Sequence, residues 1–179
     1  MGQAVLRRAR MHPGQLVIGI DPDARAMVDS SRRASAKPEK NGLPNAMFLV
    51  ASAEDLPGPL VSLVDEVTIA LPWGSLLKSV LTADERLLAK LHQSLKVRGE
   101  VEILVSATER DAAAAGITLA NAADAQHLGC RLESAGFQLA DCRQATESDV
   151  NRLSSGWGKR LGIPERRPAW LFRLRQRRD

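Results

Sequence analysis

The sequence predicts an α/β fold with a doubly wound, mostly parallel sheet. Residues 15–21 form a fully apolar segment that ends in an acid, and residues 65–70 form a second short run predicted to be a buried strand. Between such runs lie segments with apolar residues at helical spacing, such as residues 84–95. Regular alternation of strands and helices is typical of parallel sheets covered by helices.

The expected elements follow the chain in order, and the last two strands are expected to pair antiparallel. A helix over residues 1–10 would be a crossover, which needs a strand before it. Residues 37–44 are a predicted loop, and 108–121 and 154–168 are predicted insertions or RNA-facing loops of a single domain spanning 1–179. Strands are expected over residues 15–21, 45–50, 65–70, 97–107, 137–143 and 169–174. Helices are expected over 23–36 with Asp23 as N-cap, 75–81, 84–95, 122–135 closed by Gly136, and 146–153 with a Thr146–Asp149 capping box.

Composition excludes several classes of protein. The 179 residues include two cysteines and three scattered histidines, which make neither a disulfide framework nor a metal-ligand pattern, so no metal is expected. No apolar run approaches the length of a membrane span, and the expectation is a monomeric cytoplasmic protein. The net charge is +4, and basic residues concentrate from residue 152 onwards, which indicates either a polyanionic partner or a solvated tail.

Trp73 lies in a turn just after the predicted strand at residues 65–70. Ligands of open α/β sheets bind at the carboxyl ends of the strands, so Trp73 could present its aromatic face to a ligand. The alternative is that Trp73 covers the core, since Trp is largely buried on average. Trp170, in the last predicted strand, is expected to be a core residue.

Two acids follow successive predicted strands. Asp21 ends one strand directly before a helix, where an acid can accept hydrogen bonds from ribose hydroxyls, or interact only with the helix dipole. Glu54 follows the next strand and, with Ala53, could line an adenine pocket, or be an exposed loop acid. Adjacent strands would bring Asp21 and Glu54 into one crevice. No Ser/His/Asp arrangement, carboxylate pair or Walker loop favours a hydrolase or a kinase.

Five motifs in order resemble the aminoglycoside-resistance 16S rRNA methyltransferases that modify N1 of adenine 1408, the Kam/Npm group. The resemblance covers nearly the whole chain, and the Pro-Trp-Gly-Ser-Leu-Leu block followed by a second Trp is its most specific part. The motifs are Ile18-Gly19-Ile20-Asp21-Pro22, Lys37-Pro38 through Gly42-Leu43, Ala53-Glu54-x-Leu56-Pro57, Pro72-Trp73-Gly74-Ser75-Leu76-Leu77 and Trp157-Gly158-Lys159-Arg160-Leu161.

The resemblance implies a Rossmann-like class I fold that uses S-adenosylmethionine (SAM) and methylates 16S rRNA in the small ribosomal subunit, conferring aminoglycoside resistance. It implies that Trp73 and Trp157 sandwich the flipped target adenine. The residues matching cofactor contacts are Asp21, Ala53, Glu54, Leu71 and Ser75. The residues matching RNA-facing positions are Ser155, Arg167, Lys37, Lys40, Arg110, Lys159 and Arg160.

The start of the chain departs from the family pattern. Gly2 matches the final glycine of an acid-x-Gly-x-Gly-Asp-Gly loop that wraps SAM, and the family's first strand has no counterpart in this sequence. We therefore expect the central strand to be missing and its neighbours to have open edges. Two alternatives remain open: a truncated, non-catalytic RNA-binding module, and a related methyltransferase acting on another RNA, such as a tRNA guanine-N7 enzyme.

Overall fold

Two separate β-sheets form in this chain. The computed structural model describes residues 2–154, 156, 158, 161–163 and 167–177. These residues divide into two units, 1–55 and 56–179, and each unit contains one of the sheets.

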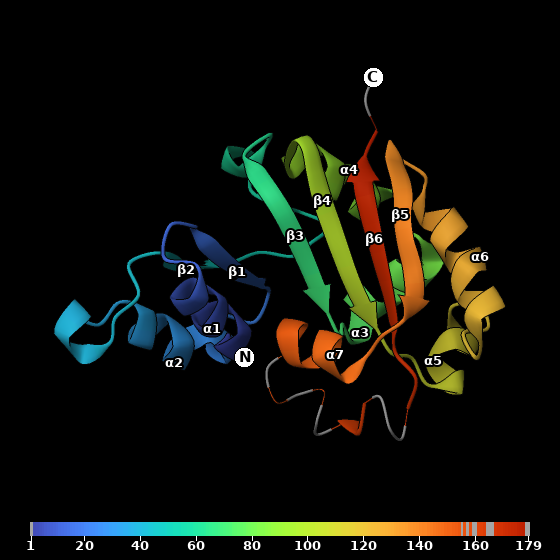
Figure 1. Ribbon diagram of the computed structural model, residues 1–179. Helices are drawn as coiled ribbons and strands as arrows, with labels where there is room; N and C mark the ends of the chain where they lie inside the picture. The colour runs from blue at the N-terminus through green and yellow to red at the C-terminus, as the bar shows by residue number, and fades with distance from the viewer. Residues whose placement is uncertain (1, 155, 157, 159–160, 164–166, 178–179) are drawn as a thin grey trace. The chain divides into compact units, whose positions relative to one another are not determined.

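Unit 1 (residues 1–55) has a parallel two-stranded sheet and two helices (Figure 1). The Asp23 side chain caps the second helix by accepting a hydrogen bond from the Arg25 amide at 3.0 Å, as predicted. That helix buries one face through Met27, Ser30 and Ala34. The elements are α1 (Gln3–Met11), β1 (Val17–Asp21), α2 (Ala24–Ala34), the 3-10 turn η1 (Pro38–Lys40) and β2 (Ala46–Val50).

The burial predicted for β1 is wrong. Only Gly19 is buried, and the other four residues of the strand are partly exposed. These residues are partly exposed because β1 has only one neighbouring strand in its sheet, β2. At Gly19 a Cβ would press against the Val5 side chain of α1, so the glycine permits close approach of this helix.

Unit 2 (residues 56–179) has a four-stranded mixed sheet in the order β3-β4-β6-β5 (Figure 1). Strands β3 and β4 are parallel, whereas β4–β6 and β6–β5 are antiparallel, which confirms the predicted pairing of the last two strands. The elements are the 3-10 turn η2 (Gly58–Leu60), β3 (Val64–Ala70), α3 (Gly74–Thr82), α4 (Glu85–Ser94), β4 (Leu95–Val105), α5 (Glu109–Ala114), α6 (Ala122–Leu132), β5 (Phe137–Gln144), α7 (Glu147–Leu153) and β6 (Trp170–Gln176).

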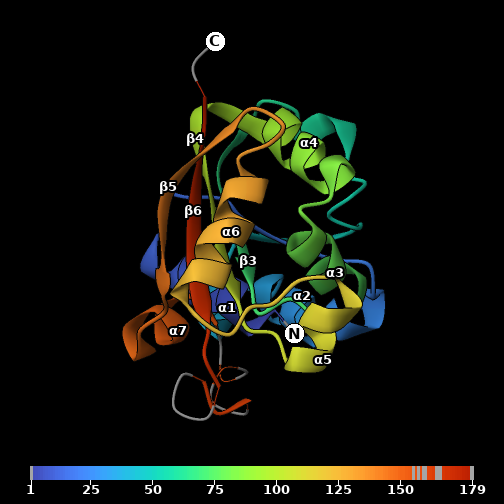
Figure 2. The ribbon, with the colours of Figure 1, turned by 90° about the vertical axis from the view of Figure 1, so that its right-hand side faces the viewer.

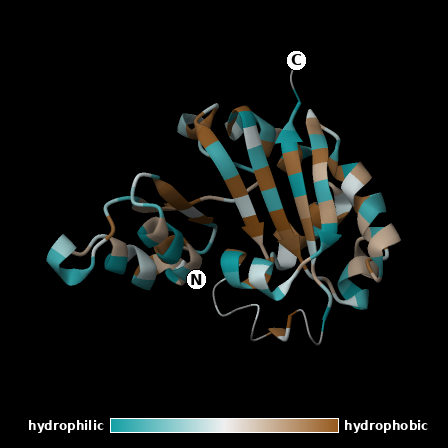
Figure 3. Ribbon diagram, viewed as in Figure 1, coloured by the Kyte–Doolittle hydropathy of each residue, from teal (hydrophilic) through white to brown (hydrophobic). Residues whose placement is uncertain are grey.

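Helices cover both faces of this sheet. Viewed along the sheet, α3, α4 and α6 lie on one side and α7 lies on the other (Figure 2). Hydropathy alternates in bands along the strands, as expected where neighbouring residues face different layers (Figure 3). Trp170 is 5% exposed, which confirms the prediction of a core residue. The core includes Val101, Ile103, Leu104, Leu128, Leu132, Phe137, Leu171 and Phe172.

In unit 2, the burial of β3 and the end of α6 differ from the prediction. Of the residues of β3, only Ile69 is buried, because β3 is the end strand of its sheet and pairs with β4 alone. Helix α6 ends at Leu132 rather than at residue 135, and Ala135 and Gly136 adopt φ values of 55° and 87° in the turn that follows.

Among the described residues, no helix is both long and apolar enough to cross a membrane.

A chain of alternating charges attaches α7 to the sheet. Glu102 of β4 is 5% exposed and accepts hydrogen bonds from Arg152 of α7, at 2.7 Å to each oxygen, and from Arg173 of β6 at 3.0 Å. Burial raises the pKa of Glu102, but the bonds from both arginines outweigh it and hold that pKa below its usual value. The pairs of opposite charge therefore join α7, β4 and β6.

The same helix begins with the predicted capping box. The Thr146 hydroxyl accepts from the Asp149 amide, and an Asp149 oxygen accepts from the Thr146 amide at 2.9 Å. Arg143 donates to both oxygens of Asp149, at 2.7 and 2.9 Å. The bonds from Arg143, followed by those from Thr146, lower the pKa of Asp149 strongly.

We predict that Asp149→Asn lowers the free energy of unfolding by about 2 kcal/mol at pH 7, because it removes a buried partner of Arg143. The folded-state pKa of Asp149 lies below the unfolded value, so its stabilisation is complete above about pH 4 and is lost as the pH falls further. Urea unfolding at pH 7 and at pH 2–3 should thus show a smaller difference at low pH. Asp65→Asn, at an exposed ion pair with Lys96, is the control and should change stability little; equal losses in both variants would contradict this account.

Candidate functional site

In unit 1 the ends of β1 and β2 meet at one edge of their sheet. Asp21 lies opposite Val50 in the parallel register, and the Ala51 amide donates to the Asp21 carbonyl oxygen at 3.3 Å. Ala53 and Glu54 follow within four residues of this edge. The expectation that Asp21 and Glu54 follow adjacent strand ends therefore matches the observed pairing.

The Asp21 carboxylate is oriented by the chain itself. Its Oδ1 accepts a hydrogen bond from the Asp23 amide at 2.8 Å, and Asp23 itself is the N-cap residue of α2. No donor among the described residues bonds to the second oxygen of Asp21, and no acid lies in the first turn of α2. The carboxylate thus retains acceptor capacity for a ligand that carries hydroxyl groups.

Glu54 and Ala53 are half-buried in the turn after β2. The Asp55 amide closes this turn on the Ser52 carbonyl oxygen at 3.2 Å. Glu54 is therefore not the fully exposed loop acid of the alternative interpretation. The half-buried position gives its carboxylate and the Ala53 backbone a surface that could contact a base edge.

In unit 2 the turn after β3 has unusual backbone geometry. Leu71 is 4% exposed, has φ of 50°, and donates its amide to the Leu104 carbonyl oxygen at 2.7 Å. Positive φ is uncommon for a non-glycine residue and costs about 1–2 kcal/mol. Gly74 also has a positive φ of 61°. The buried Leu71 side chain and its hydrogen bond hold this strained turn in place.

Trp73 stands between these two residues and is 68% exposed. It occupies the N-cap position of α3 with extended backbone, and Ser75 lies exposed in the first turn of the helix. A large aromatic side chain exposed to this degree does not cover the core, so that alternative interpretation is wrong. The turn instead presents a flat apolar face to solvent, which is the arrangement needed for stacking.

The predicted RNA-facing residues are distributed over both units. Lys37 and Lys40 are exposed beside η1 in unit 1, and Arg110 is exposed on α5 in unit 2. Arg167 is half-buried, and it donates from Nε to Ser106 Oγ at 2.8 Å and from a terminal nitrogen to the Ser106 carbonyl oxygen at 2.7 Å. Ser155, Trp157, Lys159 and Arg160 lie outside the described residues.

Both ends of the segment that carries Trp157 are fixed. At one end the charges of Glu102 and Asp149 hold α7. At the other end Arg167 bonds to Ser106, whose hydroxyl in turn donates to the Pro168 carbonyl oxygen at 2.7 Å. The sequence analysis did not predict this network. The one feature that could have indicated it is the acid Glu102 inside the otherwise apolar run of residues 101–105.

Comparison with known proteins decides the family. The family model for NpmA, a 16S rRNA (adenine(1408)-N(1))-methyltransferase, matches residues 1–175. The chain belongs to this methyltransferase family. The enzyme of that name from Streptoalloteichus hindustanus is 36% identical over 166 residues, which cover 89% of this chain and 75% of the relative. The Escherichia coli enzyme is 28% identical over 172 residues, covering 93% and 78% of the two chains.

Solved structures of other methyltransferases of the family confirm the fold class. The 16S rRNA methyltransferase KamB has a TM-score of 0.85 at 29% identity, with 99% of this chain and 84% of KamB covered. A Trp-to-Ala mutant of the enzyme from Catenulisporales acidiphilia, solved with its cosubstrate SAM, has a TM-score of 0.85 at 27% identity and covers 98% and 81% of the two chains. The predicted α/β class and the resemblance to the Kam/Npm group are both confirmed.

We predict that Ser106→Ala lowers the free energy of unfolding by about 1–2 kcal/mol, because Ser106 is buried and its hydroxyl serves both Arg167 and Pro168. Urea unfolding measures this change. Ser148→Ala, at an exposed position of α7, is the matched control and should be nearly neutral. A neutral Ser106 variant would show that the bonds of the Ser106 hydroxyl to Arg167 and Pro168 contribute nothing to stability.

Proposed function

We propose that this protein transfers a methyl group from SAM to N1 of adenine 1408 in 16S rRNA and thereby confers aminoglycoside resistance. The observation that carries this proposal is the exposed Trp73 on its strained turn, in a chain that belongs to the corresponding methyltransferase family. We further propose that it acts as a monomer, without a metal, on the small ribosomal subunit in the cytoplasm.

In unit 1, the residues proposed to contact SAM are Asp21, Ala53 and Glu54. The family resemblance also implies Leu71 and Ser75, which lie in unit 2, as cofactor contacts. Asp21 would accept hydrogen bonds from the ribose hydroxyls, and Ala53 and Glu54 would contact the adenine edge. When bound, SAM supplies an electrophilic methyl group on a positively charged sulfonium. The free acceptor oxygen of Asp21 supports this assignment, because it requires no rearrangement of the β1–α2 turn.

Methylation of adenine N1 requires no proton transfer by the protein before the methyl group is transferred. Adenine N1 carries a lone pair at neutral pH, so no general base is needed. The target base must instead leave its stack and be held in line with the methyl group. We propose that Trp73 and Trp157 hold the extruded base between their rings. Methylation gives the adenine a positive charge, and aromatic faces favour that cation over the neutral base.

The activity is tested directly with 16S rRNA and radiolabelled SAM. Methyl transfer is counted, and its position is mapped by reverse transcription, which stops at N1-methyladenine because the Watson–Crick edge is blocked. An RNA with guanine at position 1408 is the control and should accept no label. Label on the control RNA, or a stop at another nucleotide, would show that the target is different.

We predict that Trp73→Ala lowers the methylation rate about tenfold or more, since each aromatic face is worth about 1–2 kcal/mol to the cationic base. SAM affinity measured by calorimetry and the free energy of unfolding should change little, because the side chain is exposed. Trp73→Phe should restore part of the rate. Val97→Ala, at a more exposed apolar residue of unit 2, is the control; full activity of Trp73→Ala would overturn the stacking role.

We predict that Asp21→Asn weakens SAM binding by about 10- to 100-fold, because hydrogen bonds to a charged acceptor are worth about 1.5–3 kcal/mol. Calorimetric titration measures the dissociation constant. Asp23→Asn is a closely matched control, since asparagine caps helices as well as aspartate does. Equal affinities of the wild type and Asp21→Asn would remove Asp21 from the proposed cofactor site.

A further inference from the structure

The Arg167 side chain of unit 2 is held by neutral oxygen atoms. Its Nε donates to the Ser106 hydroxyl at 2.8 Å, and one terminal nitrogen donates to the Ser106 carbonyl oxygen at 2.7 Å. The other terminal nitrogen has no acceptor among the described residues. The two bonds orient the guanidinium but leave its charge uncancelled, because neither acceptor carries a formal charge.

Other arginines of unit 2 are held by acids. Each of four guanidinium groups makes an ion pair with an aspartate or a glutamate, so its charge is cancelled within the fold. These side chains connect elements of the structure to each other. They are Arg143, Arg152, Arg173 and Arg175.

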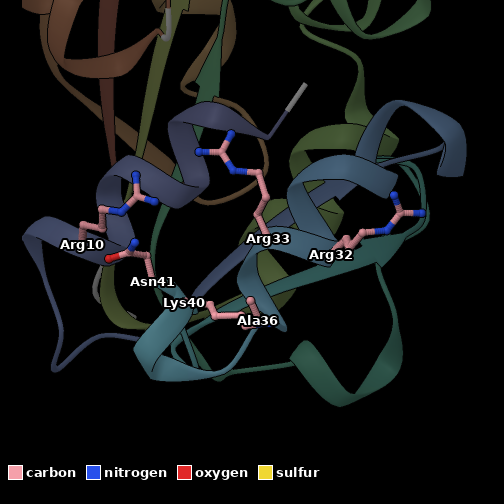
Figure 4. Close-up of a pocket in the computed structure, with 6 residues that line it drawn as sticks. All are labelled: Arg10, Arg32, Arg33, Ala36, Lys40 and Asn41. Atoms are coloured by element: carbon pink, nitrogen blue, oxygen red, sulfur yellow. The ribbon is translucent and has the colours of Figure 1, made fainter.

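Unit 1 contains arginines of a third kind, which no described bond holds. Figure 4 shows Arg10, Arg32 and Arg33 around a pocket, with Arg32 directed away from the other two. Within the described part of the chain, no hydrogen bond or ion pair joins these three side chains to another residue. An arginine in this condition loses rotamer freedom when it binds a ligand, and that loss weakens binding. Arg167 avoids this loss because Ser106 already orders it.

The Ser106 hydroxyl is itself fixed in direction. It is buried and donates its proton to the Pro168 carbonyl oxygen at 2.7 Å. Its lone pairs therefore remain available to accept from Arg167 Nε. One serine thus bonds to the side chain of Arg167 and to the backbone of the residue that follows it.

Ser106 lies at the same edge of the four-stranded sheet as the turn that carries Trp73. Strands β3 and β4 are parallel, so their carboxyl ends share this edge, and Ser106 directly follows β4. Two residues earlier, the Leu104 carbonyl oxygen accepts from the Leu71 amide at 2.7 Å, at the start of the Trp73 turn. The end of β4 therefore holds both this turn and the guanidinium of Arg167.

The acid Asp111 on α5 does not cancel the charge of Arg167. Its carboxylate accepts from the Thr108 hydroxyl at 2.7 Å and from the Thr108 amide at 3.0 Å. These bonds, and to a smaller extent the charge of Arg167, lower the pKa of Asp111. No ion pair among the described residues joins Asp111 to Arg167. The oriented guanidinium thus keeps its charge for an external anion.

We propose that Ser106 is a positioning residue for substrate binding, which holds the Arg167 guanidinium in the orientation that contacts a phosphate of the RNA. That Arg167 faces RNA rests on the proposed function. Ser106 touches no substrate in this arrangement. It acts through Arg167, by removing the cost of ordering that side chain when the RNA binds.

The test is a double-mutant cycle on the affinity of the full chain for an RNA hairpin with the sequence around adenine 1408. Ser106→Ala should weaken binding about three- to tenfold, which is the cost expected for ordering one free arginine side chain. In an Arg167→Ala background the same substitution should change the affinity by less than about twofold, since the side chain that Ser106 positions is absent. Fluorescence anisotropy of the labelled hairpin measures the four dissociation constants.

Ser94→Ala controls for a loss of stability alone. Ser94 directly precedes β4, is buried like Ser106, and donates its hydroxyl to the Leu91 carbonyl oxygen at 2.8 Å. Its replacement should lower the free energy of unfolding but leave the RNA affinity unchanged. Ser106→Thr keeps a hydroxyl and should retain most of the affinity. Ser106→Cys has nearly the same volume with a weak hydrogen-bonding group, and it replaces Ser106→Ala in the cycle if the alanine variant does not fold.

Equal losses on replacing Ser106 in both backgrounds would overturn the proposal, because they would show that Ser106 does not act through Arg167. An unchanged affinity of Ser106→Ala, or an equal loss in Ser94→Ala, would overturn it as well. Methyl transfer by the wild type is measured in parallel. Coupled effects on RNA binding without any methyl transfer would refute the proposed function and leave the positioning role supported.

Discussion

The architecture of unit 2 depends most on the ion pairs that the Glu102 carboxylate makes with two arginines. A buried acid in the middle of β4 is tolerable only because two arginines from different elements bond to it. Arg173 reaches it from β6, directly opposite in the antiparallel register, and Arg152 reaches it from α7. Removing the acid would leave two cations without their partner and would weaken the attachment of α7 to the sheet. The helix that leads into the Trp157 segment is therefore placed by charge as well as by apolar packing.

The turn after β3 illustrates how strain and exposure are combined. Leu71 places its side chain in the apolar cluster around Leu104, Val150 and Leu171, and its left-handed backbone redirects the chain at that point. The next residues leave the core, and Trp73 becomes exposed. The burial of the Leu71 side chain thus offsets the cost of exposing Trp73, which follows two residues later in the chain. A more flexible turn at Leu71 would let Trp73 adopt more conformations, and ordering its side chain would then cost more free energy when a base stacks on it.

Features encoded locally could be predicted from the sequence. The caps at Asp23 and Thr146 depend on residues within three positions, and both are confirmed. The burial of β1 and β3 was predicted wrongly, because burial depends on how many strands lie beside each one. The Glu102 network joins residues 50 and 71 positions apart, and no local pattern indicates such pairing. For the candidate site, the adjacency of Asp21 and the turn after β2 followed from strand order, whereas the exposure of Trp73 required the structure.

The unequal surroundings of the tryptophans have an optical consequence. The chain has no tyrosine, so its near-ultraviolet emission comes almost wholly from tryptophan. Trp170 is enclosed by the sheet, while Trp73 is open to solvent and to collisional quenchers. An aromatic base stacking on Trp73 would therefore alter the quenchable part of the emission and leave the shielded part unchanged. The protein thus carries an intrinsic fluorophore at the surface where the target base is proposed to bind.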